Sequence, residues 1–159
     1  MTDRSSMKQL EILLLIIGIW CVAVVCNAQD VNGLEIGKEY TKAQVIDKLG
    51  QPDRFEIDNS YDGNGMKFTY GNNIFYFYNW GEGAIFADFS IYTEQFVTMS
   101  QFVQGGIKIG DDVSKIKLLG LKIEKSGTYA YKIWFEDWAY MTFGYNDSKI
   151  THIGCTVLD

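Results

Sequence analysis

Two stretches of this chain carry nearly the same sequence, and this repetition limits the possible folds more than any other feature. The first, LEIGKEYTKAQVIDKLG, begins at Leu34, and the second, IKIGDDVSKIKLLG, begins at Ile107. Gly37 and Gly110 occupy the same place in the two stretches. Short aromatic runs typical of strands follow each stretch. A long repeat of this kind indicates two copies of one supersecondary unit.

Each repeated stretch predicts a short helix with a hydroxyl-bearing N-cap. Thr41 and Ser114 each precede apolar residues at helical spacing, and their side chains can accept hydrogen bonds from first-turn N–H groups. Gly50 ends the first run, and the second run is shorter by about one turn. Gly37 and Gly110 stand before the caps, where we expect turns with positive φ.

Strands with short turns between them follow both predicted helices. Connections of two to five residues rich in Gly, Asn, Asp and Ser indicate antiparallel meanders. We therefore predict an α+β fold of two tandem repeats, each a short helical segment followed by a four-stranded antiparallel meander. The predicted strands are Arg54–Asp58, Met66–Tyr70, Ile74–Asn79, Ala84–Tyr92, Leu121–Lys125, Thr128–Phe135, Trp138–Tyr145 and Lys149–Leu158.

Residues 1–28 have the pattern of a secretory signal peptide. Basic residues precede an apolar run from Ile12 to Cys26, which is shorter than the roughly 20 residues of a membrane span, and Ala28 suits a signal peptidase. We favour cleavage after Ala28, no stable membrane insertion afterwards, and a periplasmic or secreted location. A retained anchor and a lipoprotein acylated at Cys26 are the alternatives, the second disfavoured by the bulky Val25. The remaining chain divides into a first repeat at 29–92, a connector at 93–106 and a second repeat at 107–159.

Charge and cysteine content exclude several functional classes. The net charge is −6 without a basic cluster, which disfavours nucleic acid as a partner. Removal of the signal leaves Cys155 alone, so no internal disulfide forms. Cys155 alternates with Ile153 and Val157, which indicates a small buried hydrophobic residue. His152 would point to the opposite face of such a strand, so a Cys/His catalytic pair is not expected.

The alternation within the predicted strands separates two faces of each sheet. The face expected to lie under the helices carries Phe55, Ile57, Phe68, Phe75, Phe77, Phe89 and Ile91 in the first half, and Ile133, Phe135, Met141, Phe143, Ile153, Cys155 and Val157 in the second. The other face is rich in Tyr and Trp, which are favoured at protein interfaces. Its candidate partner-binding residues are Tyr76, Tyr78, Trp80, Trp134, Trp138 and Tyr140.

The segment from Gly37 to Pro52 reads Gly-x-x-x-Thr-x-x-x-Val and then Leu-Gly-x-Pro. With the helix-then-meander order, it resembles the repeat signature of the beta-lactamase inhibitor protein (BLIP) fold and of the related small lipoprotein domain of the outer-membrane barrel-assembly machinery. The second copy lacks the Pro. The resemblance to the inhibitors implies a concave aromatic sheet surface that clamps a partner, formed by the six aromatic residues named above. Those inhibitors are stapled by disulfides, unlike this chain after signal removal.

The sequence contains no catalytic or metal-binding signature that we can support. The segment Asp58–Asp62 imitates the start of a calcium loop, but Thr69 stands where the closing bidentate Glu belongs, and a hairpin turn explains the same residues. The adjacent acids Glu136 and Asp137 lie at a turn, which does not favour paired-carboxylate hydrolysis. His152 is the single histidine and a lone candidate base. We therefore expect no metal and no cofactor.

Taken together, these features predict an exported, non-enzymatic binding module. Its expected partner is another envelope or secreted protein, which it recognises through the aromatic sheet face. One alternative is a structural accessory factor in cell-envelope or outer-membrane assembly. Another is a small hydrolase, which would require a pocket that gathers His152 with an acid.

Overall fold

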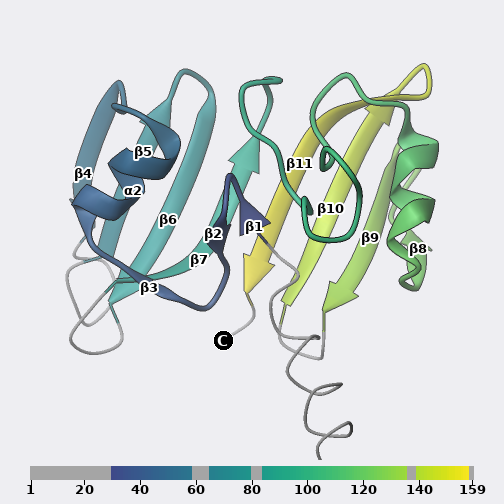
Figure 1. Ribbon diagram of the computed structural model, residues 1–159. Helices are drawn as coiled ribbons and strands as arrows, with labels where there is room; N and C mark the ends of the chain where they lie inside the picture. Colours follow the sequence, from purple (N-terminus) through teal and green to yellow (C-terminus); the bar gives the residue numbers. More distant parts are fainter. Residues whose placement is uncertain (1–29, 59–64, 80–83, 136–138, 158–159) are drawn as a thin grey trace, which may run out of the picture.

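The protein is built around one antiparallel sheet of nine strands (Figure 1). The computed structural model describes residues 30–58, 65–79, 84–135 and 139–157. The order across the sheet is β4-β5-β6-β7-β11-β10-β9-β8, and β3 pairs with β7 outside this path. The strands are β3 (Glu39–Tyr40), β4 (Arg54–Asp58), β5 (Gly65–Tyr70), β6 (Asn73–Asn79), β7 (Ala84–Ile91), β8 (Ile123–Lys125), β9 (Ala130–Phe135), β10 (Ala139–Asn146) and β11 (Lys149–Val157).

The predicted α+β class, with two tandem helix-plus-meander repeats, is wrong. Strands dominate the fold, and they form one sheet because β7 pairs with β11. Phe89 lies opposite Cys155, and Ile91 lies opposite Ile153. This pairing satisfies backbone groups that two separate sheets would leave at open edges. The eight predicted strands themselves are confirmed, each within two residues of its expected bounds.

Helix α2 (Lys42–Leu49) forms where the sequence predicts it, and its N-cap is Thr41. The Thr41 hydroxyl accepts a hydrogen bond from the Gln44 amide at 3.3 Å, and the Gln44 side chain accepts one from the Thr41 amide at 2.8 Å. This reciprocal pair is a capping box. Val45 and Leu49 are buried, and Gly50 ends the helix at φ 85°.

The second helical segment, η2 (Val113–Leu119), is a 3₁₀ helix rather than an α-helix. The prediction that Ser114 is its N-cap is wrong, because Asp112 occupies this position. The Asp112 carboxylate accepts hydrogen bonds from the amide and hydroxyl groups of Ser114, at 2.9 and 2.6 Å. The carboxylate thus begins the helix before Ser114, and Gly120 ends it in the left-handed region. Gly37 and Gly110 have the expected positive φ values of 81° and 87°.

All the other described elements lie on one face of the sheet (Figure 1). We call this the inner face and the opposite surface the outer face. Over the inner face lie α2, η2, the hairpin of β1 (Asp30–Val31) and β2 (Leu34–Glu35), and the segment that joins β7 to η2. This joining segment packs against the fold, because it buries Phe96, Met99 and Val103.

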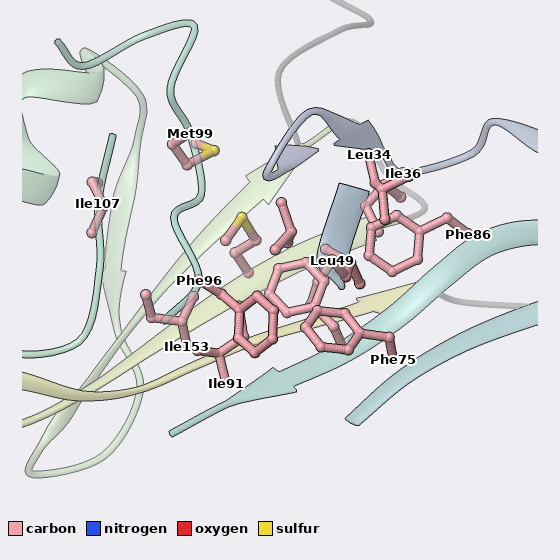
Figure 2. Packing of buried hydrophobic residues seen from close by; sticks show 14 of the residues in the cluster. Leu34, Ile36, Leu49, Phe75, Phe86, Ile91, Phe96, Met99, Ile107 and Ile153 are labelled. Atoms are coloured by element: carbon pink, nitrogen blue, oxygen red, sulfur yellow. The ribbon is translucent and has the colours of Figure 1, made fainter. Parts of the chain in front are cut away.

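The core fills the space between the inner face and these elements, and phenylalanine dominates it (Figure 2). Phe96 of the joining segment packs its ring against Phe75 of β6, with the ring centroids 4.9 Å apart. Burial of each such side chain contributes about 2–3 kcal/mol. One expectation about burial is wrong: Ile57, in the edge strand β4, is 59% exposed. An edge strand has no neighbour on one side to cover its apolar side chain.

A buried carboxylate fastens the β1–β2 hairpin to the joining segment. Asp30 is almost fully buried, and its side chain accepts hydrogen bonds from the Gly33 amide at 3.2 Å and from the Ser100 amide and hydroxyl at 3.2 and 2.8 Å. Its backbone carbonyl also accepts a 2.6 Å hydrogen bond from the Thr98 hydroxyl. One residue therefore connects the start of the described chain with a segment about seventy positions later.

We expect the substitution Asp30→Ala to lower the free energy of unfolding by about 3 kcal/mol, because it leaves several buried donors without acceptors. Chemical denaturation followed by circular dichroism measures the loss. Asp47→Ala is the matched control, since Asp47 is exposed on α2 and its removal should cost less than about 0.5 kcal/mol. Equal losses in the two variants would contradict a fastening role for Asp30.

Candidate functional site

The outer face is the part of the sheet that no other described element covers (Figure 1). Its residues alternate with core residues: Tyr76 lies between the buried Phe75 and Phe77, and Tyr140 lies next to the buried Met141. Because β7 pairs with β11, the aromatic residues of β6 and those of β9 and β10 share one continuous surface. This surface is the candidate site.

Trp134 and Tyr140 form an aromatic cluster on β9 and β10 around a lysine. Their ring centroids are 5.1 Å apart, and Trp134 is 36% exposed. The Lys132 ammonium lies 3.9 Å from the centroid of the Trp134 ring and 3.5 Å from that of Tyr140. Each cation–π contact of this kind contributes about 0.5–1 kcal/mol at an exposed position. The three side chains therefore restrain one another, which lowers the entropy lost on binding a partner.

A carboxylate completes this cluster at the edge of the sheet. The indole N–H of Trp134 donates a 3.1 Å hydrogen bond to Glu124 of β8, and Lys122 forms a 2.7 Å ion pair with the same carboxylate. The hydrogen bonds from Lys122 and then from Trp134 lower the pKa of Glu124 below its ordinary value. The indole orientation is thus fixed by a charged acceptor at neutral pH.

A second group lies on β5 and β6, where Lys67 approaches Tyr76. The ammonium of Lys67 is 5.4 Å from the centroid of the Tyr76 ring, within the range of a cation–π contact. Lys67 also lies 3.8 Å from Glu56 of β4, which pairs with Arg54 at 2.8 Å. Like the first group, this one sets a lysine against an aromatic ring.

Between the two groups stands Asp88 of β7, directly opposite Tyr76. Its Oδ2 atom accepts a 3.0 Å hydrogen bond from the Tyr78 hydroxyl, and its Oδ1 atom accepts a 2.9 Å hydrogen bond from the Val157 amide. The second bond reaches β11 just beyond the last backbone pair between β7 and β11. Asp88 therefore links both halves of the sheet on the outer face.

His152 of β11 lies on the same face and stacks on Tyr92, with the ring centroids 4.7 Å apart and the planes 25° apart. Its ring also covers Gly154: a Cβ atom built there would lie 3.1 Å from the imidazole Cε1. The Nε2 atom is shielded from solvent and has no hydrogen-bond partner among the described residues. Burial lowers the pKa of His152, because it disfavours the imidazolium.

The structure brings together some of the predicted site residues. Trp134 contacts Tyr140, whereas Tyr76 lies three strands away from Tyr140. The predicted residues Trp80 and Trp138 lie outside the described residues. Our choice of candidate site residues left out Lys132, Lys67 and Asp88. The Lys–Trp alternation in β9 is a signal for Lys132, but cross-strand neighbours depend on the register.

Other sequence predictions have mixed outcomes. Cys155 is buried, as expected, and burial followed by the charge of Asp88 raises the pKa of its thiol. The candidate calcium segment Asp58–Asp62 lies largely in residues 59–64, outside the described residues, as do Glu136–Asp137 and residues 1–28. Among the described residues, no carboxylate pairs with His152, and no group of His, Cys, Asp and Glu is arranged to hold a metal. No helix in this part of the chain has the length and hydrophobicity of a membrane span.

Comparison with known proteins does not identify the chain. No family model matches it, and no curated protein matches it. It is similar to the crystal structure of a DUF4309 family protein, YjgB, from Bacillus subtilis subsp. subtilis str. 168, with 15% identity and a TM-score of 0.38. The similarity covers 79% of this chain and 82% of that protein. A similarity this low carries no argument about function, and the resemblance to the BLIP fold stays a prediction.

We expect the stability of the protein to fall as the pH drops below about 6.5, the ordinary pKa of histidine. The folded protein binds the His152 proton more weakly than the unfolded chain does. The contribution of neutral His152 to the free energy of unfolding is therefore complete above this pH, and it is lost as the pH falls through the lowered pKa of the folded state. Urea denaturation between pH 5 and 7 measures the slope. His152→Phe is the control, since Phe can stack on Tyr92 without titrating. Parallel pH profiles would contradict the prediction.

We also expect Gly154→Ala to destabilise the protein by about 1–3 kcal/mol, since the new methyl group would lie 3.0 Å from the Thr142 hydroxyl and would also meet the His152 ring. In the double variant with His152→Ala, the loss should be smaller than the sum of the single losses by about 1 kcal/mol. Thermal or chemical denaturation of the unmodified protein, the two single variants and the double variant completes this double-mutant cycle. Strict additivity would show that the imidazole does not occupy this space.

Proposed function

We propose that the protein is an exported, non-enzymatic binding module whose outer face recognises another envelope or secreted protein. The observation that carries the proposal is the cluster of Trp134, Lys132 and Tyr140 on a sheet face that no other described element covers. Tryptophan and tyrosine side chains concentrate binding energy at interfaces. The cluster is already ordered in the free protein, so a partner need not order it.

The pattern of acids and bases on the outer face also supports binding more than chemistry. The carboxylates of Glu56 and Glu124 are engaged by neighbouring cations, and Asp88 is hydrogen-bonded across the sheet. Within the described residues, His152 has no acid to orient it as a general base. These groups are arranged to hold side chains in place.

A photo-crosslinking experiment tests the proposal. A benzophenone amino acid replaces Tyr92, which is 49% exposed on the outer face, and in a matched protein it replaces Leu118, which is 68% exposed on η2 over the inner face. Irradiation of producing cells should yield one discrete protein adduct from position 92 and none from position 118.

The second-site substitution Trp134→Ala should reduce the position-92 adduct roughly thirtyfold, as expected for a tryptophan whose removal costs 2 kcal/mol or more. The melting temperature of this variant controls for folding. Adducts of equal yield from positions 92 and 118, or an adduct indifferent to Trp134→Ala, would rule out this face as the binding surface.

A further inference from the structure

Strand β4 lies at one end of the sheet and has a strand beside it on one side only (Figure 1). It pairs with β5 there, and no described strand pairs with its other side, which we call the free edge. Backbone N–H and C=O groups along such an edge can pair with a strand of another molecule. Ile57 of β4 is 59% exposed, so the free edge offers apolar surface together with these backbone groups.

The charges of β4 follow a pattern that is complementary to itself. Arg54 and Glu56 lie on the same face of the strand, two residues apart, and Phe55 between them faces the opposite way. A second β4 can run antiparallel to the first about a two-fold axis at Phe55. Arg54 of each copy then lies directly opposite Glu56 of the other, at a distance where opposite charges stabilise strand pairing. A second copy of this chain is therefore the partner that these charges fit.

The ion pairs already present leave room for the new ones. Arg54 forms a 2.8 Å ion pair with Glu56, and its side chain is 70% exposed. A guanidinium carries five N–H donors, and a carboxylate has about four acceptor positions, so one such contact exhausts neither group. Glu56 also lies 3.8 Å from Lys67 of β5. Two copies can thus share their charges in one network without breaking the pairs within either copy.

The apolar side of β4 fits the same arrangement. Phe55 lies opposite Phe55 of the second copy, and Ile57 lies diagonally beside that ring, which is within reach of cross-strand contact. The Phe55 ring is held in place before association, because it packs against Phe68 with centroids 5.0 Å apart and lies 3.6 Å from the Lys42 ammonium. Pairing of the free edges therefore covers the exposed Ile57 side chain with an ordered aromatic ring.

We infer that two copies of this chain form a dimer through the free edges of β4, antiparallel and centred on Phe55. The inference goes beyond the proposed function and concerns a different part of the sheet. The contact is isologous, so it closes as a dimer and does not grow into a filament. The edge strand β8 does not offer the same fit: it has only three residues, and pairing about its centre sets Glu124 against Glu124 of the second copy.

This geometry has a consequence for the outer face. Directly opposite residues of paired strands share a face of the sheet, so the outer faces of both copies lie on the same side of the extended sheet. One pair of short strands is a small interface, and we expect a dissociation constant on the order of 10 µM.

Sedimentation of the purified protein between about 1 and 300 µM tests the inference and should show a monomer–dimer equilibrium. Arg54→Glu and Glu56→Arg each set like charges against one another across the two-fold axis, so each variant alone should dimerise at least tenfold more weakly. An equimolar mixture of the two variants should restore the dimer, because the altered charges of one then lie opposite the complementary charges of the other.

Two further variants control for net charge and for folding. Lys125→Glu changes the net charge by the same amount as Arg54→Glu, at an exposed position on β8, and should leave the dimer unchanged. Ile57→Ser should weaken the dimer roughly tenfold, since two-fold symmetry removes the apolar contact twice. Because Ile57 is exposed in the single copy, this variant still tests the inference if the charge variants do not fold. Thermal melting shows which variants are folded.

A protein that stays monomeric up to about 300 µM would overturn the inference and would show that the charges of β4 instead protect its edge from pairing. A dimer indifferent to Arg54→Glu or to Ile57→Ser, a dimer that Lys125→Glu weakens equally, or folded charge variants that do not pair in the mixture would overturn it as well. None of these outcomes affects the position-92 adduct, which reports on the outer face.

Discussion

The antiparallel pairing of β7 with β11 is the interaction on which the rest of the structure depends. It brings Phe89 and Ile91 beside Cys155 and Ile153, and so joins the buried side chains of both halves into one core. Phe96 packs over this junction on the inner face (Figure 2). On the outer face, the same pairing turns two separate aromatic surfaces into one. A core and a candidate binding face thus follow from one set of backbone hydrogen bonds.

The edge of β7 is shared between two partners, and this explains the position of Asp88. β3 pairs with β7 at Ala84 and Ile85, while β11 pairs with it from Phe89 to Ile91. Asp88 lies between these regions, where its side chain accepts the Val157 amide in place of a backbone carbonyl. A hydrogen-bonding side chain is needed here because β11 leaves the ladder. The structural requirement also holds a charge at the centre of the outer face.

Local features of this fold were predictable from the sequence, whereas the partners of strand edges were not. Alternation of apolar residues predicted the strands, and the Thr41 N-cap and Gly50 predicted α2. The prediction for the second helix was wrong in detail, because Asp112 takes the N-cap position instead of Ser114. The Asp112 carboxylate accepts hydrogen bonds from both donors of Ser114. The fold class was wrong because alternation shows which face is buried but not which strand lies beside which.

The same limit applies to the candidate site. Alternation predicted that Tyr76, Trp134 and Tyr140 lie on sheet faces turned away from the core, but the lysines that contact them depend on register and diagonal neighbours. Those lysines resolve a physical conflict. A bare aromatic sheet face invites non-specific association, and an ammonium group near each of these three rings keeps the surface hydrated. Because Lys132 is held by π contacts worth only about 1 kcal/mol each, a partner can displace it at small cost. The outer face is therefore compatible with both a soluble free state and an ordered bound one.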